Sequence, residues 1–399
     1  MKILVANVGS TSYKCRLIDM NTEIDLAKGG IEKVGSENAI ISYYKGNKEI
    51  VKDLVKPIKN HKEAVQLMID FLVDKDNGVV GSIKEIDGVG FKTIQAGDKN
   101  GSVLLTKEVT DAMEAYASLA PAHNPPYLKC IYYFQEIMPD TPLVGVFEPG
   151  FHTEIPEYAR VFGVPYEWYE KYHVKKYGYH GASFRYVTQE ISKLLNIDLN
   201  NIKMIICHLG GSSSICAFKD GKSIDVSMSF TPQSGLLQSA RVGDIDPFVF
   251  PYIMEKKNIT LDEALKEASS NGGLFGISGV GKDMREIWSA VDSGNKRAKL
   301  AVDKFVYDII RYIGSYYLLL GGLDILAFSG GIGLNDIRLR KIVLDKIKFI
   351  GIEIDEEKNN ERTEGIKTKP ESKIKVIALN TNEEIVVARE TASVIKGKN

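Results

Sequence analysis

Near its start the chain reads Lys2-Ile-Leu-Val-Ala-Asn-Val8, then Gly9-Ser-Thr-Ser12, then a second strand-like stretch from Tyr13 to Met20. The second half repeats this plan as Lys203-Met-Ile-Ile-Cys-His-Leu209, Gly210-Gly-Ser-Ser-Ser214 and Ile215-Cys-Ala-Phe218. Only a tight hairpin fits so short a run of small residues between two strands. Glycine lets a backbone approach an anion closely, while N–H and hydroxyl groups donate hydrogen bonds to it. Both hairpins therefore have the composition of a phosphate-binding turn.

One such hairpin is weak evidence, because many surface hairpins are rich in glycine and serine. Two of them in one chain predict a duplicated fold that holds a nucleotide between its halves. Hairpins followed by helices in both halves indicate an α/β fold with mixed sheets. With 399 residues the chain is also longer than one hydrophobic core usually supports, which predicts two domains. Their boundary is expected at Glu148-Pro149-Gly150.

The composition is that of an ordinary soluble globular protein, with 44% apolar residues, 26% charged residues and a formal net charge of -1. It offers no basic excess for binding nucleic acid or an anionic membrane. No stretch approaches the roughly 20 apolar residues that span a bilayer. The four cysteines are dispersed without metal-ligand spacing, which predicts free thiols, most of them buried, rather than disulfides. A cytoplasmic location is expected.

Apolar spacing and turn residues predict the other elements. Helices are expected over residues 61–75, 106–119, 127–137, 260–269, 296–320 and 383–394, with a further helix ending near residue 195. Buried strands are expected over residues 86–93, 142–147, 222–227, 324–329 and 373–379. Three segments are expected to be less regular: short strands and loops over 21–60, a rigid turn over 123–126 and a loop-rich stretch over 151–186.

Two further glycine-rich segments are candidates for nucleotide binding. Residues 276–283 nearly spell a phosphate-binding loop, but Asp283 stands where that loop needs a hydroxyl, and a polar stretch precedes it, so this interpretation is rejected. Ser329-Gly-Gly-Ile-Gly333 follows a predicted strand, where ligands bind in open α/β sheets. Alone it is equally well a tight turn, but together with the two hairpins it favours a seat for a base or ribose.

At this point the chain resembles a known family. Asn7-Val-Gly-Ser-Thr-Ser, His208-Leu-Gly-Gly-Ser-Ser and Phe328-Ser-Gly-Gly-Ile-Gly are similar to the phosphate-1, phosphate-2 and adenosine motifs of the superfamily that joins acetate and sugar kinases to actin. More closely, the chain resembles the acetate kinases over essentially its whole length. Further matching motifs, in the family's order, are Ala120-Pro-Ala-His-Asn-Pro, Tyr177-Gly-Tyr-His-Gly-Ala-Ser-Phe, Phe230-Thr-Pro, Ala240-Arg-Val-Gly-Asp-Ile-Asp-Pro, Asp283-Met-Arg and Thr381-Asn-Glu-Glu.

The resemblance implies two similar domains of the actin-like, ribonuclease H-like fold, with mixed sheets and an interdomain cleft. The N-terminal domain would span residues 1–149, with residues 385–399 returning to it, and residues 150–384 would form the C-terminal domain with the nucleotide seat. The implied activity is reversible phosphoryl transfer from ATP to a short-chain carboxylate, acetate or a related small acid, giving ADP and an acyl phosphate. Family members are usually homodimers.

The resemblance also implies roles for single residues. Arg241 would grip the carboxylate and the transferring phosphoryl group, a task suited to a planar guanidinium. His180 would donate to the phosphoryl group, and its flanking glycines suggest little packing around it. Asn7 and Glu384 would hold Mg2+ (or Mn2+), mainly through its waters. Nucleotide contacts carry over to Ser10, Ser12, Lys14, His208, Gly210, Gly211, Ser212, Asp283, Arg285, Gly330, Gly331, Ile332, Gly333 and Asn335; for Asp283 and Arg285 an ordinary surface ion pair is the alternative.

Departures from the family pattern cluster at the substrate. Lys92 stands where the family has a second carboxylate-binding arginine, and so lacks the bidentate fork. Glu148 replaces an aspartate of the catalytic set, Gly211 replaces an asparagine and Phe184 a histidine. The substrate pocket is predicted from Lys92, Ile94, Ala122, His123, Tyr179 and Pro232, in which Ala122 opens space and Tyr179 adds a hydroxyl.

Two hypotheses of different classes follow from these departures. In the first, the chain is a working carboxylate kinase whose preferred acid differs from acetate, since one methylene shifts preference by about 1–3 kcal/mol. In the second, it is a nucleotide-binding relative with little turnover and a regulatory or structural role. The presence of Arg241, His180, Glu384 and Asn7 favours the enzyme. A sugar kinase ranks third, because a hydroxyl acceptor needs a positioned carboxylate base.

Overall fold

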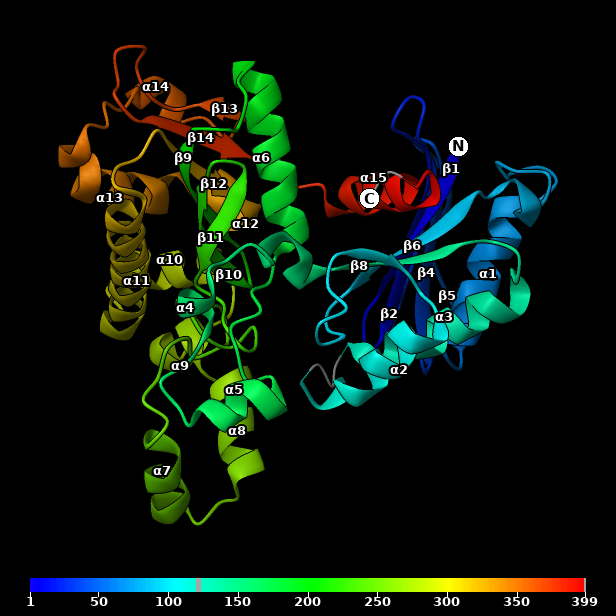
Figure 1. Ribbon diagram of the computed structural model, residues 1–399, viewed down its shortest axis with the longest axis horizontal. Coiled ribbons are helices and arrows are strands. Elements are labelled where there is room, and N and C mark those ends of the chain that lie inside the picture. Colours follow the sequence, from blue (N-terminus) through cyan, green and yellow to red (C-terminus); the bar gives the residue numbers. More distant parts are fainter. Residues whose placement is uncertain (120–122, 398–399) are drawn as a thin grey trace. The chain divides into compact units, whose positions relative to one another are not determined.

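A computed structural model describes residues 1–119 and 123–397, and its chain divides into two compact units (Figure 1). The first unit contains residues 1–150 and 382–399, and the second contains residues 151–381. Among the described residues, every helix is too short or too polar to cross a membrane. The four cysteines are free and buried, as predicted.

The first unit is built on a sheet with the strand order β5-β4-β3-β2-β1-β6-β8-β7. Its strands are β1 Lys2–Val8, β2 Ser12–Asp19, β3 Ile24–Glu32, β4 Ser36–Lys45, β5 Lys48–Ile58, β6 Gly88–Thr93, β7 Ser102–Leu104 and β8 Leu143–Phe147. The prediction of short strands and loops over residues 21–60 was wrong, because β3, β4 and β5 are paired strands of 9, 10 and 11 residues. Strand β5 is exposed along nearly all of its length, so its sequence lacks the alternation that marks a half-buried strand.

The second unit has a smaller sheet with the order β11-β10-β9-β12-β14-β13. Its strands are β9 Lys203–Leu209, β10 Ser213–Lys219, β11 Lys222–Val226, β12 Ile325–Ser329, β13 Gly365–Ile366 and β14 Lys375–Leu379. The first hairpin turns between Val8 and Tyr13, and the second between Leu209 and Ser213. Both predicted hairpins are therefore present, and they differ in the length of their turns.

The two sheets share one topology, which confirms the predicted duplication. In the first unit, β1 pairs antiparallel with β2 and parallel with β6, β2 pairs antiparallel with β3, and β6 pairs parallel with β8. In the second unit, β9, β10, β11, β12 and β14 repeat these pairings in the same order and direction. Strands β7 and β13 also correspond, since each pairs antiparallel with the last parallel strand of its sheet. Each unit thus contains the same six-stranded mixed sheet, which β4 and β5 extend in the first unit.

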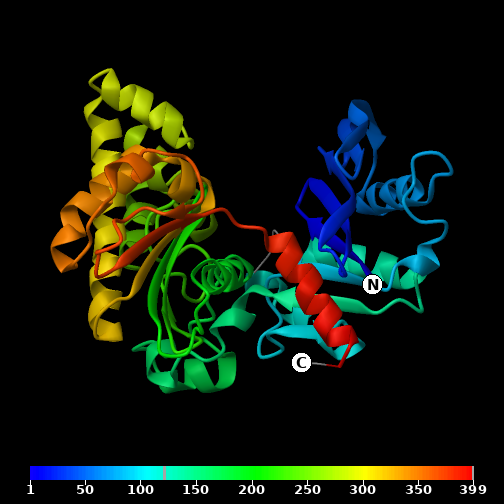
Figure 2. The ribbon, with the colours of Figure 1, turned by 90° about the horizontal axis from the view of Figure 1, so that it is seen from above.

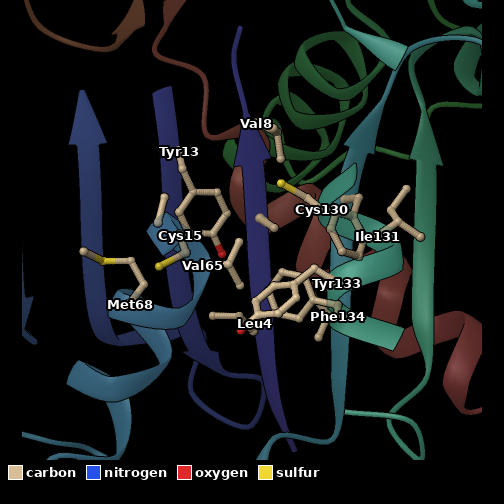
Figure 3. Packing of buried hydrophobic residues seen from close by; sticks show 14 of the residues in the cluster. Leu4, Val8, Tyr13, Cys15, Val65, Met68, Cys130, Ile131, Tyr133 and Phe134 are labelled. Carbon is tan, nitrogen blue, oxygen red and sulfur yellow. The ribbon is translucent and has the colours of Figure 1, made fainter. Parts of the chain in front are cut away.

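Helices cover both faces of the first sheet. Helices α1 (His61–Val73) and α3 (Asn124–Ile137) pack on one face, where Leu4, Val8, Tyr13 and Cys15 meet Val65 and Met68 of α1 and Cys130, Ile131, Tyr133 and Phe134 of α3 (Figure 3). Helix α15 (Glu383–Ile395) contacts the other face at β1, β6 and β8 (Figure 2). The glycines of β6 allow this helix to pack close to the strand, because a Cβ on Gly90 would lie only 2.3 Å from Thr391 Oγ1. The last helix of the chain is thus part of the first unit's core.

The second sheet is covered in the same way. On one face, Ile205, Cys207 and Leu209 of β9 pack with helices α11 (Lys296–Leu320) and α13 (Ile337–Ile347). On the other face, the alternate residues of β9 pack with helix α6 (Gly181–Leu195). The position of α6 on its sheet therefore matches that of α15 on the first sheet.

Several helix predictions need correction. Helix α3 begins at Asn124, not after the prolines, because proline is tolerated in the first turn of a helix. Helix α6 begins at Gly181, earlier than predicted. Helix α2 (Lys107–Ala115) is followed by a 3-10 turn over Ala117–Leu119, and the predicted stop at residues 120–121 lies outside the described residues. The other helices are α4 Glu157–Arg160, α5 Tyr166–Tyr172, α7 Val249–Lys257, α8 Leu261–Ser270, α9 Gly273–Ser278, α10 Met284–Asp292, α12 Gly330–Asn335 and α14 Glu356–Asn359, with 3-10 turns at Ile83–Glu85, Glu148–His152 and Lys348–Ile350.

Candidate active site

The first hairpin presents a tight turn with its small side chains outward. The Gly9 N–H donates to the Ser12 carbonyl at 2.8 Å, and a Cβ on Gly9 would lie 2.4 Å from the Ser12 hydroxyl oxygen, so a larger residue would force that hydroxyl to move. Ser10 is exposed and Ser12 is half-buried. His61, at the start of α1, holds the turn through a 2.8 Å hydrogen bond between its Nε2 and the Gly9 carbonyl. No motif in the sequence connects His61 with this turn.

The second hairpin is stabilised by its own serines. The Gly210 N–H donates to Ser213 Oγ at 3.1 Å, and that hydroxyl donates back to the Gly210 carbonyl at 3.0 Å. Gly211 is exposed and Ser212 is half-buried. The backbone of this turn is therefore fixed from within, while its tip stays open to a ligand.

Arg241 contacts this second turn, although they are far apart in sequence. Its Nη1 donates to Ser212 Oγ at 2.9 Å and approaches Gln238 Oε1 at 3.3 Å and the Pro232 carbonyl at 3.4 Å. All three partners are neutral, and among the described residues the guanidinium makes no ion pair. Burial lowers the pKa of Arg241 from its usual value, but an arginine stays charged at pH 7. The positive charge is thus uncompensated by protein carboxylates within its unit.

His180 and His208 contact each other beside the same hairpin, to which His208 belongs as a residue of β9. His180 Nδ1 is 2.8 Å from Ser214 Oγ, and the two imidazole rings are 4.6 Å apart between centroids. His180 has a left-handed backbone, with φ of 60°, at the start of α6. His208 Nδ1 is 3.3 Å from Ser329 Oγ, which belongs to β12. The expectation of little packing around His180 was wrong, because the ring packs against His208.

An ion-pair cluster forms at the carboxyl ends of β6 and β8 in the first unit. The Lys92 ammonium contacts Glu148 Oε1 at 3.2 Å and forms a shorter ion pair with Glu383. Burial disfavours the charge on Lys92, but the two carboxylates outweigh burial and raise its pKa above the usual value. Glu148 is almost fully buried, with 4% of its surface exposed. Lys92 is therefore held between two carboxylates, one of which, Glu383, the sequence did not single out.

Asn7 and Glu384 line one cavity of about 210 Å³ in this unit. Lys14 lines the same cavity, together with Arg16 and Lys28. The Tyr127 hydroxyl lies 3.5 Å from Asn7 Oδ1, and burial raises the pKa of Tyr127 to about 12. Among the described residues, no group of three or more His, Cys, Asp or Glu side chains could hold a metal ion. A cation bound here would meet two protein oxygens and mostly water.

The residues predicted for the acyl pocket fall on both units. Ile94 and His123 are half-buried in the first unit, and Ala122 lies outside the described residues. Tyr179 is buried in the second unit, where its hydroxyl donates to the Phe230 carbonyl at 2.7 Å. The hydroxyl predicted for the pocket thus already donates to the backbone. Pro232 turns its carbonyl toward Arg241 and Gln238.

The predicted adenosine residues lie at the end of β12. Gly330, Gly331, Ile332 and Gly333, predicted as a tight turn or a nucleotide seat, form the first turn of helix α12, and Asn335 ends that helix. Gly330 has φ of 77°, and a Cβ there would lie 2.5 Å from the Leu209 carbonyl. Gly331 is exposed, and a Cβ there would have no atom within 4 Å. The end of β12 therefore leaves room for a ligand at Gly331.

Asp283 and Arg285 pair with each other at the start of α10. Hydrogen bonds from Arg285 lower the pKa of Asp283 to about 2. Arg285 is almost fully exposed, so this geometry fits the surface ion pair as well as a nucleotide contact. The rejected phosphate-binding loop, residues 276–283, begins inside helix α9 and is preceded by helix α8 rather than by a strand, in agreement with that rejection.

Comparison with known proteins settles the family. A sequence model of the Acetokinase family matches residues 2–389. The chain belongs to the acetokinase family. It is 44% identical to the acetate kinase of Desulfitobacterium hafniense strain DSM 10664 / DCB-2, covering 99% of this chain and 100% of the relative. It is 40% identical to the acetate kinase of Clostridium novyi strain NT, covering both chains completely.

Solved structures of acetokinases agree with this assignment. The crystal structure of Porphyromonas gingivalis acetate kinase has a TM-score of 0.91 at 36% identity and covers 99% of both chains. A propionate kinase from Francisella tularensis has a TM-score of 0.90 at 34% identity, covering 98% of this chain and 99% of the other. Both sheets of the present chain thus have the architecture of an acetokinase, as the sequence motifs predicted.

Proposed function

We propose that this acetokinase transfers the γ-phosphoryl group of ATP to a short-chain carboxylate and releases ADP and an acyl phosphate, reversibly. The observation that carries the proposal is the state of Arg241. Its hydrogen bonds come from Nη1 and go to neutral groups, and Nε and Nη2 donate to none of the described residues. A half-buried guanidinium with two open nitrogens is suited to bind a carboxylate or phosphoryl group in bidentate fashion.

The proposed chemistry needs no catalytic base. A carboxylic acid has a pKa near 4, so its oxygen is already a nucleophile at pH 7. That oxygen bonds to the γ-phosphorus while the bond from phosphorus to the β-phosphate oxygen breaks, and both electrons of that bond leave with ADP. The transferring group is stabilised mainly by positioned positive charge and donors. Arg241 and His180, which contact the second hairpin, would supply these, and we assign Lys92 and Glu148 of the first unit to the same catalytic set.

The nucleotide would bind along the two hairpins and β12. Ser10, Ser12 and Lys14 in the first turn, and His208, Gly210, Gly211 and Ser212 in the second, would contact phosphates. Gly331, which has open space at its Cβ position, would support the adenosine together with Gly330, Ile332, Gly333 and Asn335, and Asp283 and Arg285 would lie at its edge. Glycine at position 330 is required by the fold itself, because a side chain there would collide with β9.

Asn7 and Glu384 fit a hard divalent cation, since both present oxygen atoms to one cavity. We propose that they hold Mg2+, or Mn2+, chiefly through coordinated waters. When bound, the cation would neutralise charge on the β- and γ-phosphates. Lys14 lines the same cavity and would add a positive charge on the phosphate side.

The preferred acid is proposed to be acetate or a close relative, because proteins of the same fold and family are named acetate kinase and propionate kinase. Ile94, Ala122, His123, Tyr179 and Pro232 would shape its pocket. A sugar kinase fits less well, because Arg241 contacts no carboxylate among the described residues that could serve as the base. The non-catalytic alternative finds no support in the comparisons.

We further propose that the two compact units are the two domains of the enzyme, which pairs as a homodimer in the cytoplasm. The family resemblance supports the homodimer, and four free thiols support the reducing compartment.

The test is a hydroxamate trap with ATP and Mg2+ across formate, acetate, propionate, butyrate and hydroxylated acids. We expect turnover on at least one acid, a loss of at least 100-fold in Arg241→Ala, and no change in Arg362→Ala, an exposed arginine of the same unit. Silence on every acid despite ADP binding would refute the proposal.

A further inference from the structure

A buried glutamine links the residues proposed for the two substrates. Gln238 is fully buried in the loop that precedes Arg241. Its Oε1 accepts from Ser212 Oγ at 2.9 Å, from the Ser213 N–H at 3.3 Å and from Arg241 Nη1 at 3.3 Å. Its Nε2 donates to the Pro232 carbonyl at 2.9 Å. Because an N–H can only donate and a carbonyl only accept, these partners fix which way the amide points.

We propose that Gln238 is a positioning residue that couples Arg241 to the phosphate-binding turn 210–213. This inference rests on the proposed function of that turn and of Arg241. One oxygen sets the orientation of the guanidinium, of the Ser212 hydroxyl and of the Ser213 N–H together. A shift of the turn toward a phosphate would therefore move the carboxylate-binding arginine with it.

The backbone holds Gln238 as firmly as its side chain does. Its N–H donates to the Arg241 carbonyl at 3.0 Å, and its own carbonyl accepts from the Leu274 N–H at 2.8 Å. Gly273 approaches so closely that a Cβ there would lie 2.1 Å from the Gln238 carbonyl oxygen. The neighbouring Ser239 N–H donates to the Gly211 carbonyl at 3.2 Å, which ties the loop to the turn a second time. Gln238 is thus a fixed reference point from which the amide reaches both partners.

A neutral amide suits this position better than a carboxylate. A glutamate would also accept from Arg241, but it would compensate the positive charge that the proposed reaction requires. The amide oxygen orients Nη1 and leaves the charge available to a ligand.

The experiment compares Gln238→Met with the wild type, using Gln135→Met as the matched control. Gln135 is a part-buried glutamine of the first unit with one long hydrogen bond, to the Leu105 carbonyl at 3.4 Å. We expect Gln238→Met to lower kcat by about 10- to 100-fold, as for loss of a hydrogen bond to a charged group, and to raise the KM for ATP less than threefold. Gln135→Met should leave both unchanged.

A double-mutant cycle separates positioning from simple destabilisation. In an Arg241→Lys background the flexible ammonium has no planar fork to orient, so Gln238→Met should cost less than threefold in kcat. Gln238→Glu retains the side-chain volume and the oxygen acceptor, and covers the case in which Gln238→Met fails to fold. We expect Gln238→Glu to lose at least as much activity as Gln238→Met, because its charge compensates Arg241.

Three results would overturn the inference. The first is a kcat within threefold of the wild type in Gln238→Met. The second is an equal loss in the wild-type and Arg241→Lys backgrounds, which would assign the effect to general structure. The third is full activity in Gln238→Glu. A wild type that binds ADP but phosphorylates no acid would instead overturn the proposed function, and this inference with it.

Discussion

Lys92→Met removes the cation that forms ion pairs with Glu148 and Glu383, and the effect on stability can be estimated from the burial of these three side chains. Glu148 is 3% exposed in its side chain, whereas Lys92 is 21% and Glu383 is 22% exposed. Breaking a fully buried pair costs about 3–5 kcal/mol, and the partial exposure of two members reduces the expected loss to about 2–3 kcal/mol. Methionine keeps most of the apolar volume, so the loss is electrostatic.

The pH dependence of this loss has a definite sign. The pKa of Lys92 is raised in the folded state, so its contribution is fully present below the lysine pKa of the unfolded chain and is lost only as pH rises through the raised value. Between pH 5 and pH 8 the wild-type contribution is therefore constant. In the variant, the carboxylates left without their cation can take up a proton at low pH. The difference from the wild type should thus be smaller at pH 5 than at pH 8.

Denaturant unfolding of the wild type and Lys92→Met at pH 5 and pH 8 measures both effects. The control is Lys107→Met, which breaks an exposed ion pair with Asp111 and should change nothing measurable. A loss in Lys92→Met no larger than in this control, or one that grows toward pH 5, would refute the electrostatic argument.

The remaining predictions concern packing, a buried histidine and the second turn. Gly90→Ala places a Cβ 2.3 Å from Thr391 Oγ1 and should destabilise the first unit by about 1–3 kcal/mol, whereas Gly314→Ala, with open space on α11, should be neutral or stabilising in the same thermal melts. Burial lowers the pKa of His152 to about 3, so the unfolded chain binds its proton first and stability should fall as pH drops below 6.5; ring ¹⁵N shifts showing a charged His152 at pH 5 would contradict this. Gly211→Asn has room, with only Ser239 Oγ near at 3.8 Å, and should lower the KM for ATP by up to about tenfold through one added hydrogen bond; a raised KM would count against the phosphate role of this turn.

Some helices, strands and hairpins could be predicted because the residue pattern that identifies each of them lies within one short stretch of sequence. The two hairpins, α1, α11 and β12 carry their periodicity and turn residues within a single stretch. Residues 24–58 were predicted as short strands and loops, because β5 is exposed along nearly all of its length and so shows no alternation of apolar and polar residues. No local pattern in the sequence shows that α15 packs on β6. Gly88 and Gly90 make this packing possible, because a Cβ at either position would collide with side chains of α15.

The residues of the candidate site also divide into those with a local sequence signal and those without one. The sequence singled out Arg241, His180 and Glu384 because each lies in a short motif of the family. His61, Gln238 and Glu383 were missed because each acts through a partner distant in sequence: the Gly9 carbonyl, the Ser212 hydroxyl and the Lys92 ammonium. The contact between His180 and His208 was missed for the same reason, since only the folded hairpin brings the two rings together.

Direct phosphoryl transfer to the carboxylate oxygen can be tested by ³¹P NMR of the enzyme with ATP, Mg2+ and ¹⁸O-labelled acetate. We expect an acyl phosphate resonance with the isotope shift of a bridging ¹⁸O. This resonance should form in step with ADP and should be absent with Arg241→Ala. Formation of ADP and inorganic phosphate without that resonance, or an unlabelled bridge, would contradict direct transfer to the carboxylate oxygen.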